Sequence, residues 1–198
     1  MFSTADTIVA IATPPGRGGI GVVRLSGVEA REIAERLTDR RKPFEPRHAT
    51  LTTVSGEDTH GAAVDQVVVT YFPGPASYTG DDVVEISAHG SPVILRAIVS
   101  AAIGAGARLA EPGEFTLRAF VNGRLDLMQA EAVADLIDSV TPLQARTAFD
   151  QLNGTLTREI AEIDAALFDL IARLEASVDF PDEGYHFIEP ASVATAID

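Results

Sequence analysis

Cysteine is absent from the 198 residues, which excludes disulfide bonds and thiolate metal sites. Lysine is almost absent too: the only one is Lys42, which stands between Arg41 and Pro43. A phosphate-binding P-loop requires a Gly-Lys-Ser or Gly-Lys-Thr sequence. The chain therefore carries no nucleotide triphosphatase site of that class.

Long hydrophobic runs are also missing. Residues 1–13 have no cationic start, and their apolar run, residues 8–12, is too short for a signal peptide. The most weakly charged stretch, residues 91–107, is interrupted by Arg96 and broken by Gly104 and Gly106, so it cannot span a bilayer. We therefore expect a cytoplasmic protein that does not interact with a membrane.

Acidic side chains dominate, but unevenly. The net charge is -14; residues 1–47 carry eight basic and six acidic side chains, whereas residues 48–198 carry seven and 23. An acidic surface binds nucleic acid phosphates poorly. Any RNA should therefore be held elsewhere, or by a partner.

With 46% apolar and 22% charged residues, the composition is that of a globular protein of one large or two small domains. Up to about Pro112, β-branched runs are mixed with turns and amphipathic segments, which predicts an α/β or α+β domain. Strands are expected at residues 7–13, 20–26, 49–54, 64–72 and 83–87, and helices at 28–37 and from Pro92 to Gly104 or Gly106.

After Pro112 and Gly113 the pattern becomes helical and begins with a short helix at residues 117–121. A helix is expected at 127–140, and one long helix from Pro142 to about Val178. A helix of about 35 residues is roughly 50 Å long. Its broad apolar stripe is typical of a bundle and requires partners, so we expect the stripe to be partly uncovered and the chain to end inside a larger architecture. The stripe consists of Phe149, Leu152, Leu156, Ile160, Ile163, Leu167, Leu170, Leu174 and Val178.

A glycine-rich segment at residues 16–21 matches the G-x-G-x-x-G pattern of dinucleotide-binding proteins. That site needs the last glycine to open a helix, whereas a β-branched strand pattern follows here, at residues 22–26. The pattern therefore favours a bent loop that lets a ligand or a second subunit approach the backbone.

Two charges interrupt apolar strand patterns: Arg24 lies in residues 22–25 and Glu85 in residues 83–86. Each either faces solvent or has a partner, because a buried unpaired charge is costly. An Arg and a Glu on neighbouring strands could together hold a flat heterocycle, since a carboxylate accepts two parallel N–H bonds from an amidine-like edge.

The histidines, His48, His60, His89 and His186, have no metal-ligand spacing, and we predict no metal site. His89 is either functional or a polar residue at a strand end. No Gly-x-Ser-x-Gly elbow is present, so no serine triad is indicated.

Several longer segments together resemble the MnmE (TrmE) family of tRNA modification GTPases, over nearly the whole chain. They are residues 6–10 (DTIVA), 12–21 (ATPPGRGGIG), 72–75 (FPGP), 77–80 (SYTG), 89–90 (HG), 112–115 (PGEF), 122–127 (NGRLDL) and 129–132 (QAEA). The resemblance implies a tetrahydrofolate-binding and dimerisation domain at residues 1–117, similar to folate-dependent aminomethyltransferases. Residues 118–198 would then be the first part of the central helical domain.

The resemblance also implies an activity and partners. The family acts with the FAD-dependent partner MnmG (GidA) to add an aminomethyl or carboxymethylaminomethyl group to C5 of the wobble uridine of tRNA. Its N-terminal domain binds a 5-formyl-tetrahydrofolate-type one-carbon donor and forms a homodimer. Its G domain hydrolyses GTP with potassium and magnesium. That domain and the family's C-terminal Cys motif are absent from this sequence, so we expect no GTP hydrolysis and no catalytic residue here.

The family's folate positions fall on Arg24, Glu85 and Arg124, and Arg124 stands where many members have Lys. The resemblance implies that Glu85 pairs with the amino-pyrimidine edge of the pterin. Arg24 and Arg124 would then donate to the pterin oxygen or to the glutamate tail. Asp81 stands where the family commonly has Glu, next to Asp82, and neither is assigned a role.

Two other functions stay open at this point. The chain could be a scaffold that dimerises and docks the flavoprotein through its long helix, without binding folate. It could also be a stand-alone one-carbon transferase, for which the clustered acid or base candidates are Asp82, Glu85 and His89.

Overall fold

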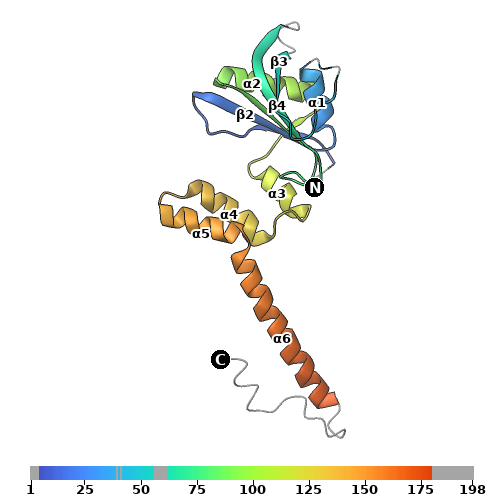
Figure 1. Ribbon diagram of the computed structural model, residues 1–198, viewed down its shortest axis with the longest axis vertical. Helices are drawn as coiled ribbons and strands as arrows, with labels where there is room; N and C mark the ends of the chain where they lie inside the picture. Colours follow the sequence, from blue (N-terminus) through green and yellow to red (C-terminus); the bar gives the residue numbers. More distant parts are fainter. Residues whose placement is uncertain (1–4, 39, 41, 56–61, 180–198) are drawn as a thin grey trace. The chain divides into compact units, whose positions relative to one another are not determined.

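The computed structural model describes residues 5–38, 40, 42–55 and 62–179 (Figure 1). The chain divides into two compact units, Met1–Ala130 and Glu131–Asp198. His60 and His186 lie outside the described residues. The elements are β1 (Ile8–Ile11), β2 (Gly18–Ser26), α1 (Ala30–Leu37), β3 (Thr50–Ser55), β4 (Ala63–Phe72), β5 (Val83–Gly90), α2 (Pro92–Gly104), β6 (Arg108–Leu109), α3 (Glu114–Val121), α4 (Leu127–Asp138), α5 (Pro142–Leu152) and α6 (Thr155–Asp179).

A six-stranded sheet forms the centre of the first unit, in the order β3-β4-β5-β2-β1-β6. Neighbouring strands are antiparallel except β1 and β6, which run parallel. The predicted mixed fold class, a sheet with helices followed by a helical segment, is confirmed. The sequence does not predict β6, because two residues are too few to produce an alternating pattern.

Helices α1 and α2 cover one face of this sheet (Figure 1). Ile33 of α1 and Ile98 of α2 are fully buried in the same apolar cluster as Leu25 of β2. Successive side chains of a strand point to opposite faces. Arg24, next to Leu25, therefore lies on the face away from the two helices, as does its cross-strand neighbour Glu85.

The helices of the second unit differ from the sequence prediction in one important respect. The single long helix expected from Pro142 is wrong: α5 ends at Leu152 and α6 starts at Thr155. Gly154 between them has a φ of 74°, a left-handed conformation that ends a helix and that glycine adopts without steric cost. The apolar periodicity continues through this break, which is why periodicity alone does not reveal it.

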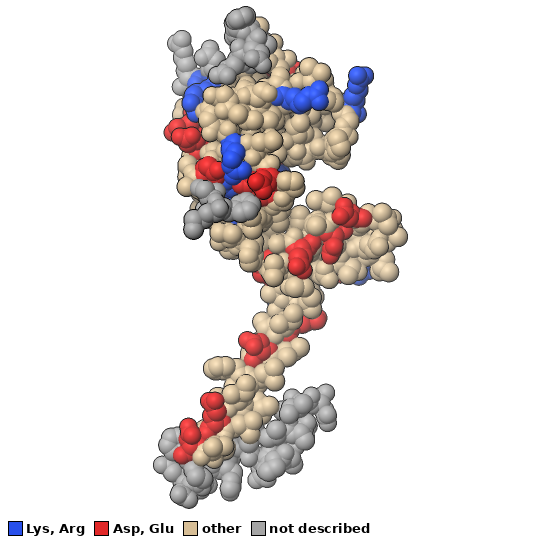
Figure 2. All heavy atoms as spheres, turned by 180° about the vertical axis from the view of Figure 1, so that it is seen from behind, with Lys and Arg blue, Asp and Glu red and all other residues tan. Residues whose placement is uncertain are grey.

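The apolar stripe of α6 is partly uncovered, as predicted. Ile163, Leu167 and Val178 are 61%, 50% and 76% exposed. On the face shown in Figure 2, acidic side chains follow the helices of the second unit, while lysine and arginine side chains are found mainly on the first. None of the helices in the described residues is both long and apolar enough to cross a membrane.

Candidate functional site

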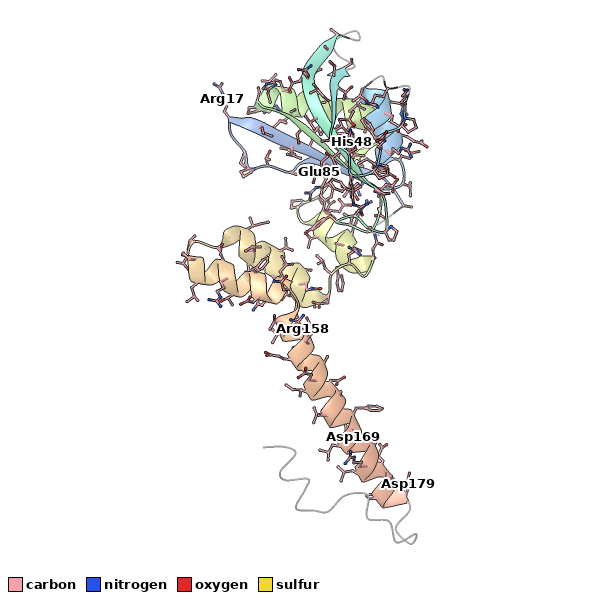
Figure 3. The ribbon with its side chains drawn as sticks, in the orientation of Figure 1. Arg17, His48, Glu85, Arg158, Asp169 and Asp179 are labelled. Atoms are coloured by element: carbon pink, nitrogen blue, oxygen red, sulfur yellow. The ribbon has the colours of Figure 1, made fainter. Side chains whose placement is uncertain are left out.

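Arg24 and Glu85 form an ion pair in the middle of the sheet. They are direct cross-strand partners on β2 and β5, and Glu85 is labelled in Figure 3. The Arg24 Nε and Nη2 atoms donate to the same carboxylate oxygen, Glu85 Oε1, at 3.0 and 2.7 Å. The side chains are 27% and 30% exposed. The structure thus brings together two of the three predicted site residues, and each is the partner of the other.

Two aromatic rings flank the Arg24 guanidinium. Its central carbon lies 5.2 Å from the centre of the Tyr78 ring and 5.8 Å from that of Phe115. Both distances are within the range of a cation–π attraction. Tyr78 comes from the loop between β4 and β5, and Phe115 from the first turn of α3. The site therefore combines a carboxylate, a guanidinium and two flat apolar surfaces.

The loop that carries Tyr78 is fixed by hydrogen bonds of Tyr78 itself and of the next residue, Thr79. The Thr79 hydroxyl lies 2.6 Å from the hydroxyl of Ser26 on β2, and the Asn122 side-chain amide donates to the Thr79 carbonyl at 2.8 Å. The Tyr78 hydroxyl itself lies 2.9 Å from Thr116 Oγ1 on α3. These contacts hold the ring in place without help from a ligand.

Arg124, the third predicted site residue, lies beside this loop. A Cβ on Gly80 would lie 3.2 Å from Arg124 Cγ, and the φ of Gly80, 86°, independently requires glycine. Arg124 is exposed, and within the described part of the chain it forms no ion pair with Glu85. The structure therefore places Arg124 near the site but not in contact with the Arg24–Glu85 pair.

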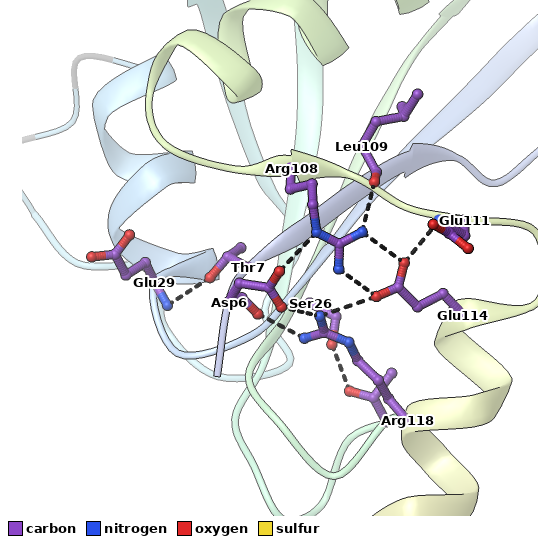
Figure 4. A network of polar contacts seen from close by, with 10 residues as sticks. Asp6, Thr7, Ser26, Glu29, Arg108, Leu109, Glu111, Glu114 and Arg118 are labelled. Atoms are coloured by element: carbon purple, nitrogen blue, oxygen red, sulfur yellow. Dashed lines mark hydrogen bonds and ion pairs between the residues drawn. The ribbon is translucent and has the colours of Figure 1, made fainter. Parts of the chain in front are cut away.

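An ion network whose centre is buried anchors α3 to β6 and to Asp6, just before β1 (Figure 4). Arg118 donates to Asp6 Oδ1 at 2.5 Å and to the Asp6 carbonyl at 2.7 Å, and it lies 3.3 Å from Glu114. Arg108 lies 2.6 Å from Glu114 and 2.7 Å from Asp6. Glu114 and Arg118 are almost completely buried. The network fixes the helix that supplies Phe115 and Thr116.

The electrostatics of this network favour its charged forms. The hydrogen bond from Arg108 is the largest cause that lowers the pKa of both Asp6 and Glu114, and it outweighs the effect of burial. The same contacts raise the pKa of Arg108, with the bond to Glu114 as the main cause. Both carboxylates are therefore ionised at neutral pH and act as structural anchors.

The structure does not assemble Asp82, Glu85 and His89 into a catalytic cluster. Asp82 accepts hydrogen bonds from the Tyr71 hydroxyl at 2.7 Å and from a backbone amide at 2.9 Å. His89 Nδ1 lies 2.8 Å from the carboxylate of Asp65. His89 is also four residues along the strand from Glu85, which corresponds to about 13 Å. In the described residues, no group of three or more metal-ligating side chains is arranged to hold an ion.

The glycine-rich segment runs directly into strand β2, as predicted, and no helix follows it. The atoms that come close to the backbone at Gly18 and Gly21 belong to other segments of the same chain. A Cβ on Gly21 would lie 2.5 Å from Leu95 of α2, and one on Gly90 would lie 2.6 Å from the carbonyl of Gly18. Arg17, at the end of this loop, lies far from Glu85 (Figure 3).

Comparisons with known proteins agree with the motifs. The family model described as "GTP-binding protein TrmE N-terminus" matches residues 7–124, and the "MnmE helical domain" model matches residues 127–198. A tRNA modification GTPase MnmE of Koribacter versatilis is 53% identical over 194 residues, which cover 96% of this chain and 42% of that protein. Proteins of the same name from Francisella tularensis subsp. holarctica and subsp. novicida are 48% and 47% identical over 195 residues, 98% of this chain and 42% of theirs.

The chain thus spans less than half the length of these curated relatives. The two family models meet between residues 124 and 127, where α3 has ended and α4 begins. Together they account for the sheet with its helices and for the helical segment that follows. By these matches the chain belongs to the MnmE (TrmE) family of tRNA modification GTPases and comprises the N-terminal and helical regions of that family.

Proposed function

We propose that the first unit binds a 5-formyl-tetrahydrofolate-type one-carbon donor at Glu85, Arg24 and Arg124. The observation that carries this proposal is the partly exposed Arg24–Glu85 pair beside two aromatic rings. Within this pair only one oxygen of the Glu85 carboxylate is used, which leaves Oε2 to accept from a ligand. A flat bicyclic head with an amidine edge fits this set of groups.

The roles of the residues follow from their chemistry. Glu85 would accept the parallel N–H bonds of the pterin edge, and the Tyr78 and Phe115 rings would bound its flat faces. Arg24 and the exposed Arg124 would donate to the pterin oxygen or to the carboxylates of the glutamate tail. When bound, the folate supplies the one-carbon unit; the chain's own residues bind and orient it.

In the longer protein, this chain would supply donor binding to a complex that modifies C5 of the wobble uridine of tRNA. The FAD-dependent MnmG would be its partner, and GTP hydrolysis with potassium and magnesium would belong to a domain outside the present sequence. The acidic surface of the helical unit in Figure 2 supports a division of labour in which the tRNA is held by the partner.

Homodimerisation through the first unit is part of the same proposal. Leu51, Val68 and Val22 lie on one cross-strand row, with Ser87 between the last two. Leu51 is 64% exposed and Val68 36%, on the sheet face that α1 and α2 leave uncovered. An apolar row on an open sheet face is suited to pack against a second copy.

Calorimetric titration with 5-formyl-tetrahydrofolate, combined with light scattering for the mass, tests this function. We expect micromolar binding to a dimer, and loss of at least tenfold in affinity for Glu85→Ala. Glu45→Ala, which removes a carboxylate at an exposed position, is the control. Binding by Glu85→Ala that equals the wild type would reject the assignment.

A scaffold that docks a partner through α6 is the second candidate, and the uncovered apolar stripe of α6 favours it. A well-folded dimer with no folate affinity would shift the conclusion to this function.

A further inference from the structure

Arg24 makes the two kinds of contact that a flat amidine-bearing ligand would make in this site. It donates hydrogen bonds to the Glu85 carboxylate at 2.7 and 3.0 Å. Its planar group also lies 5.2 and 5.8 Å from the two ring centres. A guanidinium and a 2-amino-pyrimidine edge are both planar and both present parallel N–H donors. Chemically, the Arg24 side chain therefore resembles the head of the proposed ligand.

We propose that Arg24 is an internal competitor for Glu85, and that it holds the place of the pterin head until a ligand releases it. This inference rests on the proposed folate function. On ligand entry the guanidinium leaves Glu85 and the rings, and it becomes available to the anionic tail of the ligand. A ligand with both a flat head and an anionic tail replaces the lost ion pair with a new one, between Arg24 and the tail. A head without a tail does not.

The structure allows this exchange at low cost. Both partners of the pair are more than a quarter exposed, and ion pairs with such access to water contribute little net stability. The surroundings of the pair are fixed independently of it. Tyr78 is held through Thr116, and α3, which carries Phe115, is held by the buried network around Arg118. The rings should therefore keep their positions when the guanidinium moves away.

Two probes test whether Arg24 competes with the ligand head or only attracts its tail. They are 5-formyl-tetrahydrofolate and 6-methyltetrahydropterin, which shares the amino-pyrimidine edge but has neither the formyl group nor the anionic tail. Calorimetry on Arg24→Ala should show about fivefold tighter binding of the tail-less pterin, the equivalent of a surface pair of about 1 kcal/mol. The same variant should bind 5-formyl-tetrahydrofolate more weakly than wild type. Arg24→Lys, which keeps the charge but loses the planar fork, should also bind the tail-less pterin more tightly.

Arg31 provides a matched control. It pairs with Glu35 at 2.8 Å and lies 5.4 Å from the centre of the Tyr71 ring, so it has the same chemistry outside the site. Arg31→Ala should leave the affinities for both probes unchanged. Thermal melting of every variant checks that the fold is retained.

The outcomes separate this inference from the proposed function. If the wild type binds 5-formyl-tetrahydrofolate through Glu85 but Arg24→Ala binds the tail-less pterin no better than wild type, the competitor role is overturned and the folate site stands. If neither probe binds wild type or Arg24→Ala, the folate function itself fails, and the inference fails with it.

Discussion

The hydroxyl oxygen of Tyr78 lies 2.9 Å from Thr116 Oγ1, and this contact joins the loop beside the candidate site to helix α3. It links two segments that are 38 residues apart in the sequence. Through it, the position of an exposed ring depends on a helix that is itself anchored in the interior.

Tyr78→Phe keeps the ring and removes the contact with Thr116. We expect the affinity for 5-formyl-tetrahydrofolate to fall about two- to fivefold, in keeping with the loss of one hydrogen bond, with little change in stability. Tyr71→Phe is the matched variant, because the Tyr71 hydroxyl donates to Asp82 from a buried side chain. That change should lower the free energy of unfolding by about 1 kcal/mol and leave affinity nearly unchanged. Calorimetry and urea unfolding distinguish the two results.

Arg118→Met removes the cation at the centre of the buried network. The Asp6 and Glu114 carboxylates then lose a partner, and breaking a buried pair in this way costs about 3 kcal/mol in the free energy of unfolding. Urea unfolding measures this cost directly. Arg96→Met, at an exposed position on α2, should change stability by less than about 0.5 kcal/mol. Equal effects of the two substitutions would contradict the structural role of Arg118.

Acid should weaken the same network. The pKa values of Asp6 and Glu114 are lowered in the folded chain, chiefly by Arg108. A lowered pKa means that each carboxylate stabilises the fold fully above its unfolded-state pKa, and that this contribution is lost as the pH falls through the folded-state value. The unfolding free energy should therefore fall below about pH 4. Urea titrations from pH 7 down to pH 3 test this, and Arg118→Met should show a smaller fall.

Gly154→Ala places a side chain at a φ of 74° between α5 and α6. We expect a loss of about 1 kcal/mol in stability, because the left-handed conformation brings the Cβ of an L-residue too close to the following carbonyl oxygen. Gly104→Ala at the last position of α2 is the control, since that glycine is not among the positive-φ residues and alanine favours helix. A stabilising Gly154→Ala would indicate that α5 and α6 join into the continuous helix that the sequence predicts.

The uncovered stripe of α6 should make the isolated chain self-associate or bind a hydrophobic dye. Ile163 and Leu167 are 61% and 50% exposed and lie four residues apart, on one face of the helix. Replacing both with Lys should reduce dye binding and shift the chain to a smaller species in size-exclusion chromatography. A clean monomer without dye binding in the wild-type chain would overturn this expectation.

From the sequence, the two charged residues of the candidate site can be predicted, but the two aromatic rings beside them cannot. Arg24 and Glu85 are recognisable because each interrupts an apolar strand, and a charge in such a place needs an explanation. The contacts of Tyr78 and Phe115 with Arg24 have no local signal, because both rings come from segments whose approach is set by the tertiary fold. The resemblance included both residues within longer motifs, yet it assigned them no role.

The same limit applies to the anchoring of α3 and to the break after Leu152. Arg118 and Glu114 are four residues apart on one helix, so their proximity can be read from spacing. Their partners Asp6 and Arg108 cannot, because β1 and β6 meet only when the sheet forms. At the break, apolar spacing dominated the prediction, whereas the backbone conformation of Gly154 decides the outcome.

The separation of Asp6 from Arg118, 112 residues along the chain, has a consequence during synthesis. At translation rates of about 5–20 residues per second, Asp6 leaves the ribosome roughly 6 to 22 seconds before Arg118 does. Until Arg108 is made, 102 residues after Asp6, neither arginine is available to Asp6, and β1 also lacks its parallel neighbour β6. Cotranslational folding of the first unit can therefore be completed only after α3 has emerged.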